Sequence, residues 1–125
     1  MGIWGIILVV VCVMSGVMIG FGLYFSVVGP KKINYVMGYR TPMSMKNLDT
    51  WKFGNIYAGR YMWRTGVVLL VGSLIALFAV MNAADTTIRV VGIIIIIVHA
   101  LMVVGTIVLT ESALRKNFDH QGNRK

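Results

Sequence analysis

The chain has 125 residues, of which 58% are hydrophobic and 13% charged, and its mean hydropathy is +0.80. These values exclude an ordinary soluble domain, in which about 25% of the residues are charged. A net charge of +8 would indicate nucleic-acid binding in a soluble protein, but here the charges are confined to a few segments. We therefore expect a membrane protein that binds no nucleic acid.

Three stretches of the sequence contain no Asp, Glu, Lys or Arg, and they cover residues 1–30, 65–84 and 90–110. Each is long enough to supply the roughly 20 residues with which a helix crosses the bilayer hydrocarbon. The sequence therefore predicts an all-α integral membrane protein with three transmembrane helices at about residues 3–28, 62–81 and 88–110. We expect residues 1–125 to form a single membrane domain, with a connector at 30–61 and a tail at 111–125 that frays after one or two helical turns.

The first span carries Gly16 and Gly20 one helical turn apart. Small residues let helices approach closely in lipid, where no hydrophobic force drives their association. Two interpretations are open: the pair faces a second copy of the chain in a homo-oligomer, or it packs against the other two spans. Gly29 and Pro30 predict the end of this helix, because proline disfavours helical geometry in the residue before it. No basic residue precedes the apolar run, so we expect no cleaved signal peptide.

The connector between the first two spans divides into a loop and a helix. Gly38 and Pro42 favour a loop. From Ser44, the expected N-cap, helical periodicity predicts an amphipathic helix that lies in the cytoplasmic membrane interface. We expect it to continue into the second span, with a bend near one of three glycines. The residues of its apolar face are Met45, Leu48, Trp51 and Asn55, and the glycines are Gly54, Gly59 and Gly66.

Basic residues gather on one side of the predicted topology. The connector, together with Arg64 at the start of the second span, holds seven of the twelve Lys and Arg residues, and the tail holds four more. Because positively charged segments are retained in the cytoplasm, the connector and C-terminus are expected inside and the N-terminus outside. The same charges attract anionic membrane lipids. The seven are Lys31, Lys32, Arg40, Lys46, Lys52, Arg60 and Arg64.

Groups that could carry catalysis are scarce. The acids occur in separate segments, and no nucleophile, metal-binding or phosphate-binding motif is present. His99 and His120 are too far apart for a metal site, and Glu111 is spaced to pair with Arg115. The sequence therefore predicts no enzyme, no cofactor and no metal. The four acids are Asp49, Asp85, Glu111 and Asp119.

His99 is the one ionisable residue deep in a predicted span. Such a group can act as a proton relay or a ligand contact. Alternatively, it is a neutral histidine hydrogen-bonded to Ser15, Ser73 or a free carbonyl.

The sequence around Arg40 is the best candidate for a ligand-binding or loop-organising site. Glycine permits a tight turn before Arg40, proline stiffens the chain after it, and the guanidinium offers a rigid set of donors for a carboxylate, a phosphate or the carbonyl end of a helix. Alternatively, Arg40 is an anchor to lipid headgroups. Trp51 is either a ligand contact or an interfacial anchor, and Asn55 can tie the loop to the second span. The candidate residues are Gly38, Tyr39, Arg40, Thr41, Trp51 and Asn55.

The spacing of these residues, together with the two spans that follow, resembles the signature of the SdpI family of bacterial membrane proteins. The resemblance covers Asn34 to the end of the third span. It implies a three-helix module of the bacterial cell (inner) membrane that confers immunity to a secreted peptide toxin, and that can also hold a cytoplasmic transcriptional repressor at the membrane. The residues that carry it are Asn34, Gly38, Tyr39, Arg40, Thr41, Ser44, Asn47, Trp51, Asn55 and Gly59.

Three functions follow as hypotheses. The first is immunity to a membrane-active peptide, by binding the toxin or blocking its assembly in the bilayer. The second is a signalling adaptor that recruits a cytoplasmic regulator through the basic connector. The third is a small transporter subunit or membrane enzyme, against which the lack of paired acids and of internal repeats argues.

Overall fold

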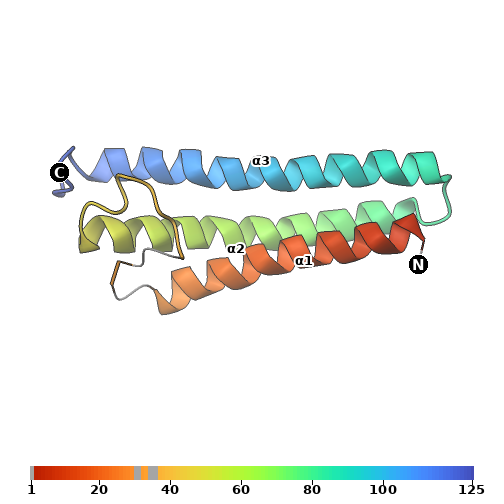
Figure 1. Ribbon diagram of the computed structural model, residues 1–125, viewed down its shortest axis with the longest axis horizontal. Coiled ribbons are helices and arrows are strands. Elements are labelled where there is room, and N and C mark those ends of the chain that lie inside the picture. The colour runs from red at the N-terminus through yellow and green to blue at the C-terminus, as the bar shows by residue number, and fades with distance from the viewer. Residues whose placement is uncertain (1, 30–31, 34–36) are drawn as a thin grey trace.

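A computed structural model describes residues 2–29, 32–33 and 37–125. Helix α1 (Ile3–Leu23) continues into a short π-helical segment, η1 (Tyr24–Val28), and is followed by α2 (Leu48–Ala79) and α3 (Asp85–Asn117). Ile3–Val28, α2 and α3 are each long and apolar enough to cross a membrane, which confirms the predicted all-α membrane fold with three spans. Figure 1 shows the helices side by side, with the C-terminus and residues 37–47 at one end, here called the connector end.

The first predicted span agrees closely with the structure, because α1 and η1 together cover Ile3–Val28. The helix ends at Gly29, as predicted, and this residue has a φ of +74°. Its N–H donates to the carbonyl of Tyr24 at 3.1 Å. The predicted contribution of Pro30 lies outside the described residues.

Helix α2 begins earlier than the predicted second span and contains the predicted interfacial helix as its first turns. Its N-cap is Asn47, so the prediction of Ser44 was wrong. The Asn47 side chain accepts a hydrogen bond from the Thr50 N–H at 2.9 Å, and the Thr50 hydroxyl accepts one from the Asn47 N–H at 3.1 Å. This reciprocal pair is a capping box, which satisfies two otherwise unpaired donors. The helix then continues unbroken past Gly54, Gly59 and Gly66.

Two glycines bring α1 and α2 into close contact. A Cβ atom built on Gly22 would lie 2.6 Å from the Gly59 carbonyl oxygen, and one on Gly59 would lie 2.8 Å from the Gly22 carbonyl oxygen. The two backbones therefore touch where no side chain fits. Gly16 and Gly20 do not share this role, since a Cβ on either would meet nothing within 4 Å. Among the described residues, these two glycines therefore do not pack against the other two spans. The other interpretation, a contact with a second copy of the chain, stays a prediction.

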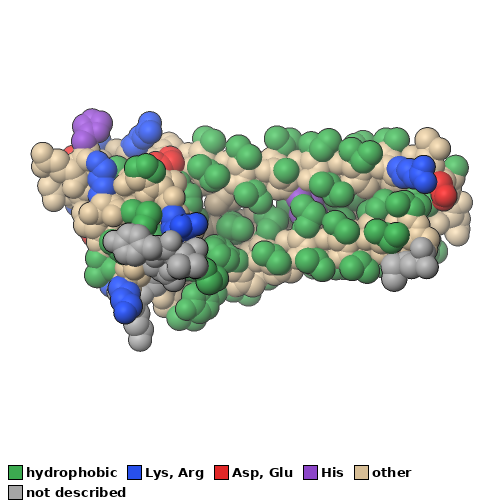
Figure 2. Space-filling model, in the orientation of Figure 1, with side chains coloured by type: hydrophobic (Ala, Val, Ile, Leu, Met, Phe, Trp, Pro, Cys, Tyr) green, Lys and Arg blue, Asp and Glu red, His purple; other side chains and the backbone are tan. Residues whose placement is uncertain are grey.

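Apolar packing closes the bundle at the end opposite the connector. Trp4 on α1 donates its indole N–H to the carbonyl of Leu77 on α2 at 2.7 Å, and Gly92 on α3 lies against Ile7. Figure 2 shows hydrophobic side chains along the length of the visible face, with most of its Lys and Arg at the connector end. The buried cluster consists of Ile7, Val11, Leu77, Ile88 and Ile95.

His99 is fully buried and bridges α3 to α1. Its Nε2 lies 2.8 Å from the Ser15 hydroxyl, and its Nδ1 lies 2.9 Å from the carbonyl of Ile95. Because a carbonyl only accepts, Nδ1 carries a proton, and in the neutral ring Nε2 accepts from Ser15. This is the hydrogen-bonded arrangement that the sequence offered as the alternative to a relay.

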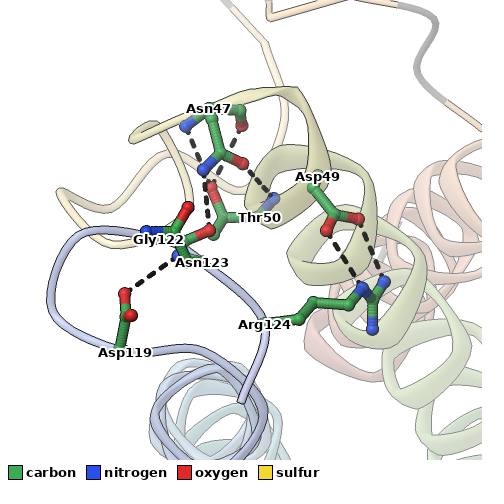
Figure 3. Close-up of polar contacts among 7 residues, drawn as sticks. All are labelled: Asn47, Asp49, Thr50, Asp119, Gly122, Asn123 and Arg124. Atoms are coloured by element: carbon green, nitrogen blue, oxygen red, sulfur yellow. Dashed lines mark hydrogen bonds and ion pairs between the residues drawn. The ribbon is translucent and has the colours of Figure 1, made fainter.

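The tail packs back on the chain, contrary to the prediction that it frays. Phe118 is 1% exposed and lies edge-on to Phe53 at a ring-centroid distance of 5.4 Å. Figure 3 shows the Asn47 side chain donating to the Gly122 carbonyl, at 2.7 Å, and the Arg124 guanidinium paired with Asp49 at 3.0 Å. The tail therefore joins the start of α2 to the end of α3.

The tail turn is fixed by one carboxylate. Asp119 accepts hydrogen bonds from the N–H groups of Gln121 and Asn123, each at 2.9 Å. Hydrogen bonds from the backbone, first from Asn123, hold the pKa of Asp119 below its usual value.

Candidate functional site: the cavity beneath the connector loop

Residues 38–41, here called the connector loop, are held by a buried amide. The Tyr39 N–H donates to Asn55 Oδ1 at 2.6 Å, and Asn55 Nδ2 lies 2.9 Å from the Trp51 carbonyl and 3.4 Å from that of Tyr39. Asn55 is 1% exposed. The Asn55 side chain thus pairs with backbone groups of the loop, as a neighbouring strand would. Because the site is buried, water could not replace it.

Gly38 is the residue that the loop geometry requires. Its φ is +113°, which side-chain-bearing residues rarely adopt. A Cβ atom there would also lie 2.7 Å from Asn55 Oδ1 and 3.0 Å from Cη2 of Trp51. The loop backbone is therefore in direct contact with both α2 side chains.

Ser44 and Thr41 close the loop on the far side of Tyr39. The Ser44 hydroxyl accepts from the Thr41 N–H at 2.9 Å and lies 2.9 Å from the Tyr39 carbonyl, to which it can donate. The Thr41 hydroxyl accepts from the Ser44 N–H at 3.2 Å. The Thr50 hydroxyl donates to the Ser44 carbonyl, which links this turn to the capping box of α2.

Tyr39 joins the loop to α3. Its hydroxyl donates to Glu111 Oε1 at 2.7 Å and lies 3.2 Å from the carbonyl of Ile107. Burial, followed by the hydrogen bond to Glu111 and the charge of that residue, raises the pKa of the Tyr39 phenol above its ordinary 10.0. Glu111 therefore bonds to Tyr39. The predicted ion pair between Glu111 and Arg115 does not form between these described residues.

Beneath the connector loop the three helices enclose a cavity of about 240 Å³, here called the loop cavity. Apolar side chains of α1, α2 and α3 form most of its wall, and Arg40 is the one residue with a fixed charge among the described residues that line it. Its lining consists of Phe21, Gly38, Tyr39, Arg40, Thr41, Asn55, Ala58, Gly59, Met62, Val103, Thr106 and Ile107.

The structure brings five of the six predicted site residues to this cavity: Gly38, Tyr39, Arg40, Thr41 and Asn55. The sixth, Trp51, does not line it. Trp51 is fully buried behind Gly38, so the structure does not place it as an exposed interfacial anchor. Its indole N–H has no hydrogen-bond partner among the described residues, a costly condition that is unusual in a protein interior.

Sequence reasoning missed the contributions of α3 and the tail. Thr106 lines the cavity, Glu111 binds the loop tyrosine, and Phe118 covers the start of α2. Thr106 and Glu111 both lie on α3, but five residues turn a helix by about 500°, so the two do not share a face and helical periodicity does not link them. The contacts of Asn47 with Gly122 and of Asp49 with Arg124 join residues 75 positions apart, and no local pattern marks them.

The fold and the site define a three-helix membrane protein whose interhelical loop closes a cavity at one end of the bundle. The sequence matches the SdpI/YfhL protein family over residues 31–110, which is more than half of the chain, and the protein belongs to that family. The match includes the connector loop, α2 and most of α3. No curated protein and no solved structure matches the chain.

Proposed function

We propose that this protein is a bacterial inner-membrane immunity protein, which protects its cell from a secreted membrane-active peptide by binding the peptide or blocking its assembly in the bilayer. The observation that carries the proposal is the loop cavity, an apolar recess between membrane helices with Arg40 at its edge. A guanidinium can bind a carboxylate of the peptide through two parallel hydrogen bonds, while the recess takes an apolar side chain.

The size of the loop cavity favours a peptide over a free small molecule. Pockets for drug-sized ligands enclose about 300–1,000 Å³, whereas this one measures about 240 Å³. That volume suits one or two side chains presented by a larger partner.

The distribution of charge supports an orientation for this site. The connector loop and the tail lie at the same end of the bundle, and eleven of the twelve basic residues fall within residues 31–64 or the tail. By the positive-inside rule this end is cytoplasmic and the N-terminus is outside. A peptide that has entered the bilayer would then meet the loop cavity at the inner boundary.

Survival of a toxin-sensitive bacterium tests this function. Cells that express the wild type, Arg40→Ala or Arg60→Ala, at matched membrane levels, are challenged with a panel of secreted killing peptides. Arg60 is an exposed basic residue of α2 that does not line the cavity. We expect the wild type and Arg60→Ala to protect against at least one peptide and Arg40→Ala to lose most of that protection. Equal survival with and without the wild type, for every peptide, would contradict the proposal.

A second function, a signalling adaptor, is favoured by a separate groove at the connector end. This groove has a volume of about 640 Å³ and lies between the Pro42–Lys46 segment and the tail. Lys46, Arg115 and Lys125 line it, and the two acids there, Glu111 and Asp119, already accept hydrogen bonds within the chain. An acidic surface of a cytoplasmic regulator, such as a transcriptional repressor, would suit it. Co-purification of a soluble partner that is lost in Arg115→Glu, with toxin survival unchanged, would favour this function over immunity.

A further inference from the structure

A second concave surface runs along the bundle between α2 and α3, within the membrane-spanning part. It consists of two hollows of about 180 and 270 Å³, which share Val68 and Leu69. We call the two together the α2–α3 groove. Its lining runs along α2 from Arg64 to Ser73 and along α3 from Ile94 to Met102.

The lining residues follow one face of each helix. On α2 they recur at intervals of three and four along residues 64–73, and on α3 they recur in the same way along residues 94–102. The two helices are antiparallel, so Met102 lies across from Arg64 at one end and Ile94 across from Gly72 at the other. The groove is therefore one continuous strip parallel to the helix axes.

The length of the strip matches one leaflet of a bilayer. From Arg64 to Ser73 the axis of α2 rises by about 13.5 Å, at 1.5 Å per residue. Half of a hydrocarbon core of about 30 Å is roughly 15 Å. Since the predicted second span begins at residue 62, Arg64 lies at the boundary of the leaflet on the connector side and Ser73 near the midplane.

The strip carries a charge at one end and none along the rest of its length, as a phospholipid does. Its deep part is lined by apolar side chains with Gly72 and Ser73, and no acidic residue occurs anywhere in its lining. Its boundary end carries Arg64, whose guanidinium lies 5.7 Å from the centre of the Trp63 ring. An arginine at this depth extends its charge toward the headgroups while its stem stays in the hydrocarbon.

We propose that the α2–α3 groove is a specific site for an anionic phospholipid of the connector-side leaflet, with one acyl chain along the groove and the headgroup phosphate on Arg64. Charge complementarity selects this occupant over a second copy of the chain, because an apolar helix would offer nothing to the guanidinium. The inference is independent of the immunity function.

Native mass spectrometry of the full chain in detergent micelles tests the site. Phosphatidylglycerol and phosphatidylcholine with identical acyl chains are titrated, and the apparent Kd of the singly bound lipid is measured. We expect the wild type to prefer phosphatidylglycerol by about fivefold, the ratio expected from one nearby arginine. Arg64→Gln removes the preference, and Arg60→Gln, which changes a cation outside the groove, keeps it.

A pair of glycine variants tests the groove without changing charge. A Cβ on Gly72 or on Gly16 would meet nothing within 4 Å, so a side chain can start at either position without a clash, but only Gly72 lines the groove. We expect Gly72→Leu to weaken binding of both lipids by about threefold or more, because the added side chain takes the place of acyl-chain contacts. Gly16→Leu binds both lipids as the wild type does.

Three results would overturn the proposal. Wild-type binding by both Arg64→Gln and Gly72→Leu would show that no lipid occupies the groove. An equal loss of preference in Arg60→Gln and Arg64→Gln would show diffuse attraction to the basic end. A change of oligomeric state in Gly72→Leu, with lipid binding unaltered, would show that a second copy occupies the groove.

Discussion

The connector end and the membrane-spanning middle of the bundle are held together in different ways. At the connector end Asn55, Ser44 and Tyr39 form a continuous set of hydrogen bonds among the loop, α2 and α3. In the middle, the one polar contact between helices with both partners fully buried, among the described residues, is that of Ser15 with His99. The comparison indicates that the middle of the bundle is held by apolar packing and close backbone contact. At the connector end, buried hydrogen bonds of polar side chains fix the conformation of the loop.

The largest expected effect is that of Gly38→Ala. The substitution forces a side chain into a positive φ and against Asn55 Oδ1, so we expect it to lower the free energy of unfolding by at least about 2 kcal/mol. SDS titration of the purified protein in mixed micelles measures this value. Gly72→Ala is the control, since open space surrounds Gly72, and it should be neutral or stabilising by up to about 1 kcal/mol. Equal effects of the two variants would show that the loop is not held as described.

Asn55→Leu should have the next largest effect, about 1–3 kcal/mol, because the buried Tyr39 N–H loses its acceptor. Hydrogen exchange at the Tyr39 amide should accelerate in the variant, while exchange near Ser15 stays unchanged. Asn117→Ala, which removes an exposed amide that bonds only to the Ala113 carbonyl, serves as the control. Slow exchange at Tyr39 in Asn55→Leu would place the support of the loop elsewhere.

Alkaline pH should weaken the link between Tyr39 and Glu111. The pKa of the phenol is higher in the folded protein than its ordinary 10.0, so its contribution to stability is complete below pH 10.0 and is lost as the pH rises above that value. The wild type should therefore lose stability more steeply above pH 10.0 than Tyr39→Phe, by about 1 kcal/mol. SDS titrations at a series of pH values measure the difference, and parallel curves for the two proteins would contradict it.

Ser15→Ala should have the smallest effect and thus sharpens the comparison between the two regions. Hydrogen bonds between membrane helices contribute about 0.6 kcal/mol on average, so the loss of the Ser15 contact with His99 should cost less than Asn55→Leu. The same SDS titration compares them, with the exposed Ser112→Ala as the control. A larger cost for Ser15→Ala would make the middle, rather than the connector end, the principal polar support of the fold.

The sequence predicted the spans well because long uncharged stretches have one stable environment in a lipid bilayer. It also predicted five residues of the cavity, since Gly38 and Asn55 are unusual choices beside a membrane helix. It failed for the start of α2, where Ser44 and Asn47 are both good caps and tertiary contacts with the tail decide between them. The closure of the tail could not be predicted, because it depends on Phe118, which has no periodic partner in the sequence.

If the loop cavity is the site of protection, a larger side chain that fills it should abolish protection. Val103, which is 40% exposed, lines the cavity, whereas its neighbour Val104, which is 55% exposed, lies on another face of α3 and does not. Survival against the killing peptide that the wild type resists is measured for Val103→Phe and Val104→Phe at matched membrane levels. We predict that Val103→Phe loses protection and Val104→Phe retains it. Full protection by Val103→Phe would contradict a role for the cavity.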